Sequence, residues 1–431
     1  MDRSRSIDAA AIFIAKVAVS LLVLRLGFSH VSDDDYARTV ISERFAHAPA
    51  LDPSGTSWLP FPFWMTGAAM TVFDRSIETA RAVHIAASAL ASAFAYLALR
   101  ALPTSRWPAL AGTLIAIALP WSAWLGAATV PEGFAAPLIV VGMATANART
   151  TRTRWLGALA LVAASLSRYE AWPVCAVFFL TGVEPGLSFD RMLAHFAALV
   201  GPVGWMAWNL HAHGSATHFL DRVASYRNAI GAGDDALSTQ LAIYPRALLD
   251  LGGEPIFLGV FALVVFCIRR DFRGRWIHAF ACAISLFAFL IYGETRGGAP
   301  THHPERALLA VAWLLVMAGV DALALVTSKL PKKATVTGAL VVSIAWLGYA
   351  VDRYIDAPAQ SADEDRTAQI ARGLDLRSRN VPHLVVTPCA YEHFALLAAF
   401  GSPERADVAA VSPHDAVTRH PAADCPRVEE R

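Results

Sequence analysis

Charged side chains are scarce in this chain of 431 residues. Asp, Glu, Lys and Arg make up 16% of the sequence and hydrophobic residues 55%, whereas charged residues form about 25% of an average soluble domain. The formal net charge is +1. No long basic patch accompanies it, so we expect no nucleic-acid partner. The mean hydropathy of +0.44 predicts a protein that crosses a membrane several times and contacts lipid.

Cysteine is also sparse, with five residues in the chain. Cys175, Cys267 and Cys282 lie in apolar segments, where a thiol is most simply a small core side chain. Cys389 and Cys425 lie in the more polar C-terminal part. If that part is outside the cytoplasm, a disulfide between these two is as good an expectation as two free thiols.

Long apolar runs recur along the first 350 residues. The first run, residues 10–28, lacks a small-residue cleavage site and is predicted to be a retained helix. Residues 155–183 are interrupted by "SRYEAWP", which indicates two short helices that meet at a polar elbow. Residues 58–73 carry two prolines and are short for a span, so we expect an interfacial or re-entrant piece. We expect about eleven membrane segments in all; the other runs are 82–99, 107–125, 134–148, 192–210, 255–268, 276–292, 306–326 and 335–350.

The short loops rich in basic residues all fall on one side of the membrane if the chain crosses it at each predicted span. Arg and Lys gather around residues 3–5, 100–106, 149–154, 191, 269–275 and 329–333. The positive-inside rule places these loops and the N-terminus in the cytoplasm. The opposite face then carries the first external loop, residues 29–81, and residues 351–431. In the latter segment, "HLVVTP" predicts a strand and "YEHFALLAAF" a helix that ends at Gly401. The chain is therefore divided into a membrane domain, 1–350, and a small external α/β domain, 351–431.

Polar groups beside the spans gather on the expected outer face. Because an ionisable residue near a membrane span is costly unless it faces a polar cavity, such residues are functional candidates. Their convergence on one face is the main indication of a site. The candidates are Asp33, Asp34, Asp35 and Tyr36 in "SDDDY", Glu132 in "TVPEG", Arg168 and Glu170 in the elbow, and His302, His303 and Arg306 in "THHPER".

Each group also has a purely structural explanation. The acidic trio can cap the helix that starts near Tyr36, because aspartate at a helix N-terminus suits the backbone donors and the dipole. Glu132 can likewise cap the helix after Pro131. The arginine and glutamate of the elbow can be a buried pair that holds two broken helices together. The two histidines can be interfacial residues without a chemical role.

The functional explanation is more specific. A carboxylate at a membrane surface can act as a general base towards a hydroxyl or amine. Asp33 and Asp34 can alternatively ligate a divalent cation, Mg²⁺ or Mn²⁺, that neutralises a phosphate leaving group. Arg168, Arg296 or Arg306 could compensate the repulsion between adjacent carboxylates, and arginine forks match phosphate oxygens. This combination indicates a substrate that carries phosphate.

The order of these motifs resembles the GT-C superfamily of integral-membrane glycosyltransferases. "DDDYARTVISERFA" after the first helix, then "PFPFW", the elbow "SRYEAWPV" and the late "HPERALLAVAWLL" correspond to its motifs across about residues 10–350. The resemblance implies an all-α polytopic membrane protein of the bacterial inner membrane, with residues 351–431 in the periplasm. It also implies an inverting transfer of a sugar from a polyprenyl-phosphate donor to an acceptor on the outer face.

The resemblance also implies roles for individual residues. Asp34 is the favoured base, followed by Asp33, with Asp35 and the second acid Glu132 as further catalytic candidates. Tyr36, Arg168, Glu170, His302, His303 and Arg306 are expected to bind substrate, with Arg306 facing the phosphate. The sequence departs from the family pattern in its third aspartate and in "HPER", which replaces the commoner H-x-R-Y.

Three other functions stay open at this point. A ligase could transfer a preassembled oligosaccharide from a lipid diphosphate. A secondary transporter would be expected to show paired repeats and charges near the middle of the membrane, whereas here the polar residues gather at one face. A membrane scaffold is the third alternative.

Overall fold

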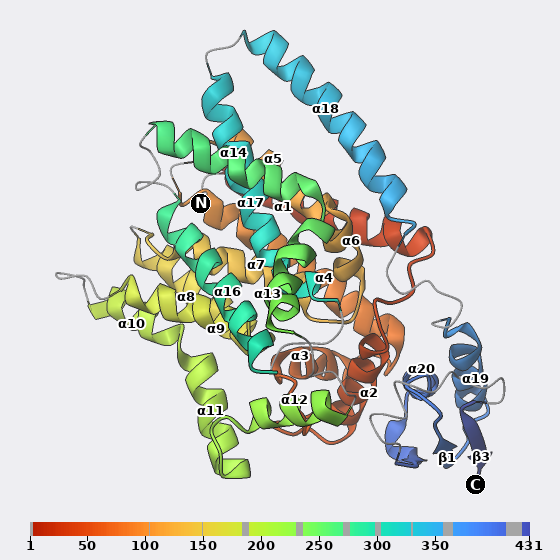
Figure 1. Cartoon of the computed structure of the whole chain (residues 1–431). Coiled ribbons are helices and arrows are strands. Elements are labelled where there is room, and N and C mark those ends of the chain that lie inside the picture. The colour runs from red at the N-terminus through yellow and green to blue at the C-terminus, as the bar shows by residue number, and fades with distance from the viewer. Residues whose placement is uncertain are drawn as a thin grey trace.

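A computed structural model describes residues 3–102, 104–148, 150–182, 189–229, 236–269, 276–297, 303–328, 331–356, 365–410 and 425–431. The chain forms a bundle of helices with one small sheet near the C-terminus (Figure 1). The helices of the bundle are α1 (Arg3–Arg25), α2 (Asp34–His47), α3 (Phe61–Met70), α4 (Ile77–Leu99), α5 (Arg106–Ala118), α6 (Pro120–Ala127), α7 (Glu132–Thr145), α8 (Thr151–Ser165), α9 (Ala171–Leu180), α10 (Phe189–Ala197), α11 (Val200–His213), α12 (His218–Ala229), α13 (Leu237–Asp250), α14 (Gly253–Arg269), α16 (Ile277–Thr295), α17 (Glu305–Thr327) and α18 (Lys332–Arg353).

Four of these helices are long and apolar enough to cross a membrane, namely α1, α4, α16 and α17. Two further pairs pass the same test as bent spans, α5 with α6 at an angle of 69° and α13 with α14 at 96°. Helices α7 and α9 are apolar but shorter. The chain is therefore a multi-pass membrane protein. Each apolar run identified in the sequence falls on one helix or a helix pair, although several of these helices are shorter than a full span.

The bend between α5 and α6 has a visible cause. Pro120 lies in the first turn of α6, and a proline cannot donate the backbone hydrogen bond that would continue α5. At the end of α5, the carbonyl of Ala118 accepts a hydrogen bond from the Tyr354 hydroxyl at 2.7 Å, and Trp124 Nε1 in α6 donates to the Tyr354 carbonyl at 3.1 Å. The end of α18 thus supplies partners that a broken helix inside a membrane needs.

Helix α17 forms the centre of the bundle. It is buried along most of its length and packs against α5, α7 and α14 (Figure 1). Glycines permit two of these approaches, since a Cβ on Gly112 would meet Met317 at 3.1 Å and a Cβ on Gly319 would overlap Leu258. Such small-residue contacts are a usual way for membrane helices to pack closely.

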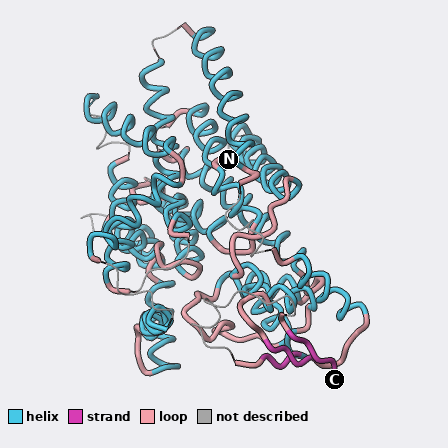
Figure 2. Tube along the Cα trace, turned by 45° about the vertical axis from the view of Figure 1, so that its right-hand side comes forward, coloured by secondary structure: helices cyan, strands magenta, loops and turns pink. Residues whose placement is uncertain are grey.

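The C-terminal part contains the only sheet in the described residues. Strands β1 (Leu384–Thr387), β2 (Ala406–Val408) and β3 (Arg427–Glu430) form it in the order β2-β1-β3, with β2 parallel and β3 antiparallel to β1 (Figure 2). Helices α19 (Thr367–Ser378) and α20 (His393–Phe400) pack against each other, and α20 ends at Gly401 with a left-handed φ of 72°. The predicted strand and helix are thereby confirmed. We call the described residues 365–410 and 425–431 the tail.

A disulfide joins Cys389 to Cys425 within the tail, as the sequence allowed. The tail packs against α2, through a hydrophobic cluster in which Tyr36 and Val40 contact residues of α20 such as Leu396. Figure 1 shows α19 and α20 beside α2 at the same end of the bundle. The expected first external loop is therefore not an open loop, because much of it forms helix α2, which contacts the tail, and helix α3, which packs against α2.

Candidate functional site

The acidic trio begins helix α2, but its three side chains face three different partners. Asp33 is the N-cap residue, and Asp34 and Asp35 lie in the first turn, where negative charge suits the helix dipole. The side chain of the N-cap residue does not cap the helix. Successive residues on a helix point about 100° apart, so the trio reaches out in different directions, and the partners decide which carboxylate is available.

Asp35 is buried and fully engaged. One carboxylate oxygen accepts the backbone N–H of Val31 at 3.0 Å, and the other accepts the backbone N–H of Thr129 at 2.7 Å and its hydroxyl at 3.1 Å. This residue ties the start of α2 to the segment before α7. With its oxygens occupied, it has a structural position and not one that faces substrate.

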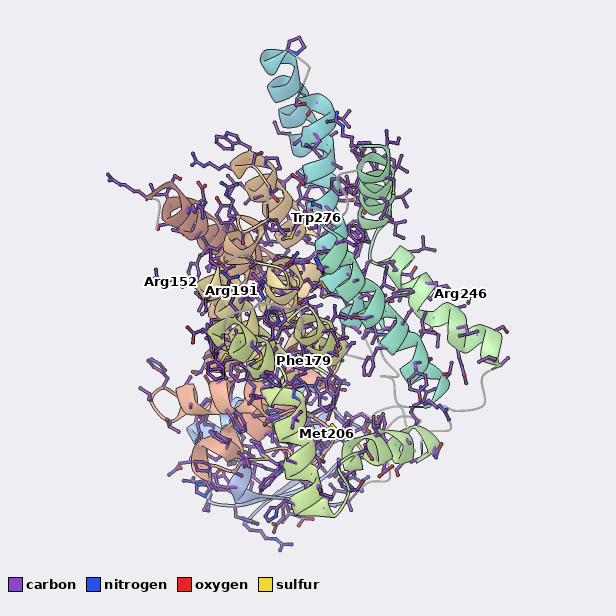
Figure 3. The ribbon with its side chains drawn as sticks, turned by 90° about the vertical axis from the view of Figure 1, so that its left-hand side faces the viewer. Arg152, Phe179, Arg191, Met206, Arg246 and Trp276 are labelled. Atoms are coloured by element: carbon purple, nitrogen blue, oxygen red, sulfur yellow. A yellow bond between two sulfur atoms is a disulfide. The ribbon has the colours of Figure 1, made fainter. Side chains whose placement is uncertain are left out.

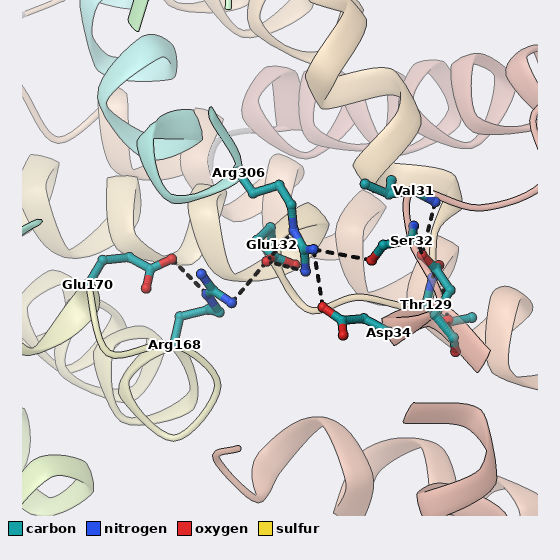
Figure 4. A network of polar contacts seen from close by, with 9 residues as sticks. Val31, Ser32, Asp34, Thr129, Glu132, Arg168, Glu170 and Arg306 are labelled. Atoms are coloured by element: carbon teal, nitrogen blue, oxygen red, sulfur yellow. Dashed lines mark hydrogen bonds and ion pairs between the residues drawn. The ribbon is translucent and has the colours of Figure 1, made fainter. Parts of the chain in front are cut away.

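Asp34 leads into a buried chain of charges (Figure 4). Its Oδ2 lies 3.3 Å from Arg306 Nη1. Arg306, in the first turn of α17, donates from Nε at 2.9 Å and Nη2 at 2.8 Å to Oε1 of Glu132. Arg168 Nη1 reaches the same Glu132 oxygen at 3.0 Å, and Arg168 Nε donates to Glu170 at 2.7 Å. The structure thus brings five of the predicted residues together, and we call them the charge network.

The charge network joins four separate parts of the chain. Asp34 comes from the start of α2, Glu132 from the start of α7, Arg306 from the start of α17, and Arg168 and Glu170 from the elbow between α8 and α9. All of these helix starts meet at the end of the bundle that carries the tail (Figures 1 and 4). The two short helices that the sequence predicted around the elbow are confirmed.

Exposure distinguishes Asp34 from the inner members of this network. The side chain of Glu132 is 1% exposed and that of Arg306 5%, whereas that of Asp34 is 40% exposed. Glu132 Oε2 has no hydrogen-bond partner in the described part of the chain. The buried glutamate therefore holds the two arginines in place, and Asp34 is the carboxylate that a molecule arriving from water can reach.

Asp33 faces away from the charge network. Its carboxylate accepts two hydrogen bonds from Arg366, from Nε at 2.8 Å and from an Nη at 2.9 Å. Arg366 immediately precedes α19 in the tail. Sequence reasoning missed this arginine because it lies 333 residues away from Asp33 in a segment that carries no recognisable motif.

The remaining predicted residues lie around this centre. The Tyr36 hydroxyl is 3.2 Å from His30 Nδ1, and the side chain is buried in the cluster that contacts the tail, where burial raises its pKa. His303 adopts a left-handed backbone conformation, φ 49°, and its ring centroid lies 5.8 Å from that of Trp121. Its carbonyl accepts the backbone N–H of Arg306 at 3.1 Å. His302 lies outside the described residues.

A second buried arginine was not found by sequence reasoning. Arg38 lies one turn after Asp34 in α2, and its guanidinium stacks on the ring of Trp58 at 4.3 Å. The side chain is buried, and its Nε and Nη1 have no partner among the described residues. Desolvation lowers its pKa to about 10, against the opposing charges of Asp34 and Glu132. The four-residue spacing from Asp34 could have signalled it, because such residues share a helix face.

The three aspartates do not fit a divalent metal ion well. Cations of this kind need several oxygen ligands that converge on one point, whereas Asp33, Asp34 and Asp35 bind Arg366, Arg306 and backbone N–H groups respectively. Within the described ranges, the one group of three or more ligand-type side chains that converges is Cys389, Glu392 and Cys425. Its two cysteines form the disulfide, so they offer no thiolate ligands to a metal.

Comparison with solved structures identifies the fold. ArnT from Cupriavidus metallidurans bound to undecaprenyl phosphate matches with a TM-score of 0.53 and 16% identity, over 90% of this chain and 74% of that chain. The oligosaccharyltransferase AglB from Archaeoglobus fulgidus, in complex with an inhibitory peptide and a dolichol-phosphate, matches with a TM-score of 0.52 and 14% identity. The chain has the GT-C fold. The match to AglB covers 86% of this chain and 58% of that one.

No protein-family profile and no curated protein sequence matches the chain. At identities of 14% and 16%, the likeness to solved structures establishes the fold alone. It confirms the fold that the motifs of the sequence implied. The GT-C fold by itself does not assign an activity, which must be argued from the charge network.

Proposed function

We propose that the protein is an inverting glycosyltransferase that moves a sugar from a polyprenyl-phosphate donor to an acceptor at the outer face of the membrane, with Asp34 as the base. One observation carries the proposal. Asp34, at 40% exposed, is the water-accessible end of a network whose other side chains are 1% to 17% exposed and are held by mutual ion pairs. The two similar structures hold undecaprenyl phosphate and dolichol-phosphate, which supports a donor of this lipid class.

The chemistry needs one proton acceptor and one group that stabilises the departing phosphate. Asp34 takes the proton of an acceptor hydroxyl or amine, and the freed electron pair forms the new bond to the anomeric carbon. The bond from that carbon to the phosphate oxygen breaks, and the lipid phosphate leaves with its electron pair. Attack from the face opposite the phosphate inverts the anomeric centre.

The position of Asp34 favours it over its neighbours as the base. Asp35 has both oxygens occupied by hydrogen bonds, and Asp33 is bound by the fork of Arg366. Asp34 has a single arginine contact, at 3.3 Å, and is the most exposed member of the network. A carboxylate that is held in place and still accessible suits a general base.

Two arginines are suited to the lipid phosphate. Arg306 contacts Asp34 directly, so a phosphate beside Asp34 would meet its guanidinium, and Arg38 brings two N–H groups that have no partner among the described residues. Arginine forks match phosphate oxygens in geometry and charge. Arg168 directs its donors to Glu132 and Glu170, so in this proposal it positions Arg306 through Glu132.

The span geometry supports a site at the outer face. Helix α4 has 23 residues, a length of about 35 Å, which is enough to cross the hydrocarbon core. It starts beside the tail and ends before the basic residues Arg100 and Arg106. Arg152 and Arg191, on the contacting helices α8 and α10, lie at a level above Met206, farther from the tail end (Figure 3). With basic loops in the cytoplasm, the charge network and the tail lie in the periplasm.

The proposal is tested by replacing Asp34 with Asn. We would reconstitute purified protein in lipid vesicles and add a panel of undecaprenyl-phosphate-linked sugars. The free undecaprenyl phosphate that is released is then measured. Asp34→Asn should lower the rate about 100-fold to 10,000-fold, the usual contribution of a general base. Glu78→Gln is the matched control, because Glu78 is an exposed carboxylate in the first turn of α4. An Asp34→Asn variant with the wild-type rate would refute the assignment of the base.

A further inference from the structure

Arg366 of the tail binds Asp33, the residue that directly precedes the proposed base. Arg366 donates two hydrogen bonds to the Asp33 carboxylate, at 2.8 Å and 2.9 Å. The side chains are 8% and 22% exposed, so the pair is largely shielded from water. A two-pronged contact between guanidinium and carboxylate fixes orientation as well as distance. The fork therefore determines the direction in which the Asp33 side chain points.

Fixing Asp33 also fixes the first turn of α2. The Asp33 carbonyl accepts the backbone N–H groups of Tyr36 at 3.1 Å and Ala37 at 3.0 Å, which are the first hydrogen bonds of the helix. On the other side of the turn, Thr129 holds Asp35. Asp34 lies between two clamped neighbours. The rotation of α2 about its axis, and with it the approach of Asp34 to Arg306, thus depends on both clamps.

The tail does not depend on Arg366 alone for its position. Its hydrophobic cluster with α2 and the ion pair between Arg75 and Glu404, at 3.0 Å, hold it independently. The Tyr391 hydroxyl lies 3.2 Å from that of Tyr226 in α12. A change at Arg366 should therefore release Asp33 without undocking the tail.

We infer that Arg366 and Asp33 form a positioning clamp, through which the tail orients Asp34 for transfer. Asp33 is then a positioning residue, which separates it from the base, and the tail is a working part of the transfer site. This inference rests on the proposed function, because it takes Asp34 as the group that accepts the proton.

The inference is tested with Asp33→Asn, Arg366→Gln, the double variant and Arg366→Lys, in the undecaprenyl-phosphate release assay. Each single change should lower kcat at least 10-fold with little change in the KM for donor. The double variant should match the singles, because residues that act as one unit are not additive. Arg366→Lys should recover only part of the rate, since lysine keeps the charge and loses the fork.

Arg379→Gln is the matched control. Arg379 makes the same kind of fork in the tail, with Glu430 at 2.7 Å for both contacts, but this pair is exposed and joins the end of α19 to β3. It should leave kcat unchanged. An Arg366→Gln variant with the wild-type kcat would overturn the clamp, and so would a double variant much slower than either single variant.

A second readout separates failure of the clamp from failure of the proposed function. Hydrogen exchange of the backbone amides in residues 31–40 reports the order of this turn without any substrate. Exchange should be faster in Arg366→Gln and Asp33→Asn than in wild type, and unchanged in Arg379→Gln. If the wild type released no lipid phosphate from any donor, the proposed function would fail, and the exchange data would still decide the clamp. Equal exchange in all variants would overturn it.

Discussion

Replacing Glu132 with Gln should be among the most disruptive single changes in this protein. One oxygen of this side chain accepts three N–H groups, two from Arg306 and one from Arg168, at 2.8 Å to 3.0 Å. Glutamine has nearly the same shape but no charge. The variant therefore leaves the buried guanidinium of Arg306 and the partly buried one of Arg168 without the carboxylate that compensates them both.

The magnitude follows from the burial of this carboxylate. Arg306 retains its contact to Asp34, which is the more exposed and the longer at 3.3 Å, and Arg168 retains Glu170 at 2.7 Å. Removal of one partner from a buried ion pair costs about 3–5 kcal/mol. We expect a loss near the lower end, about 3 kcal/mol, because each arginine keeps one carboxylate partner.

The assay is thermal unfolding of purified protein in detergent. The quantity measured is the fraction of protein that stays monodisperse after heating. Glu78→Gln, at an exposed position, should shift stability by less than about 0.5 kcal/mol, as surface changes usually do. The pair Glu132→Gln and Arg306→Gln should be less destabilising together than the sum of both changes, because the second change removes a charge that the first left uncompensated. A Glu132→Gln variant as stable as wild type would refute the view that this carboxylate holds the network together.

Two further predictions concern α2 and the tail. Glu43 is buried in α2 with no partner for either carboxylate oxygen in the described residues, and burial raises its pKa well above the ordinary value. Because the folded state binds the Glu43 proton more tightly than the unfolded state does, Glu43 contributes fully to the free energy of unfolding below the ordinary carboxyl pKa. That contribution is lost as the pH rises through the raised pKa of the folded state. The melting temperature should therefore fall with rising pH in wild type and less in Glu43→Gln, and parallel curves would contradict this. Replacing Cys389 by Ser opens a disulfide with a sequence separation of 36, which should destabilise the tail by about 4 kcal/mol on the chain-entropy estimate. Limited proteolysis of wild type and Cys389→Ser, with and without reductant, measures the resistance of the tail. Equal resistance of the two proteins without reductant would contradict the prediction.

Membrane helices could be predicted well because length and hydropathy decide them. Every backbone polar group inside a bilayer must be satisfied within the segment, so the apolar runs had to be helical. The breaks were harder to foresee. Residues 107–125 were expected to be one span, but Pro120 divides them, and the Ala118 carbonyl at the end of the first half accepts a hydrogen bond from Tyr354, 236 residues away. Local sequence indicates where a helix can break, whereas distant partners determine whether it does.

The polar connections were predicted less well. The segment between the apolar runs 192–210 and 255–268 shows no long apolar run, yet it contains α12 and α13, and α13 pairs with α14 as a bent span. Pro245 lies inside α13, and a proline in a helical pattern usually signals its end. Likewise, residues 29–81 hold two helices that pack on each other. Tertiary contacts with the tail and the bundle stabilise these helices, and such contacts leave no local pattern.

The members of the charge network were predictable as a group, but the roles within the acidic trio were not. Topology alone indicated that Asp34, Glu132, Arg168 and Arg306 share one face, because the positive-inside rule places the segments that carry them on the outer side. Asp33, Asp34 and Asp35 look alike in sequence. They differ only in partners that lie 333, 272 and 94 residues away. Two of the three are clamped by those partners, and the clamps leave Asp34 as the carboxylate that combines a fixed position with access to water.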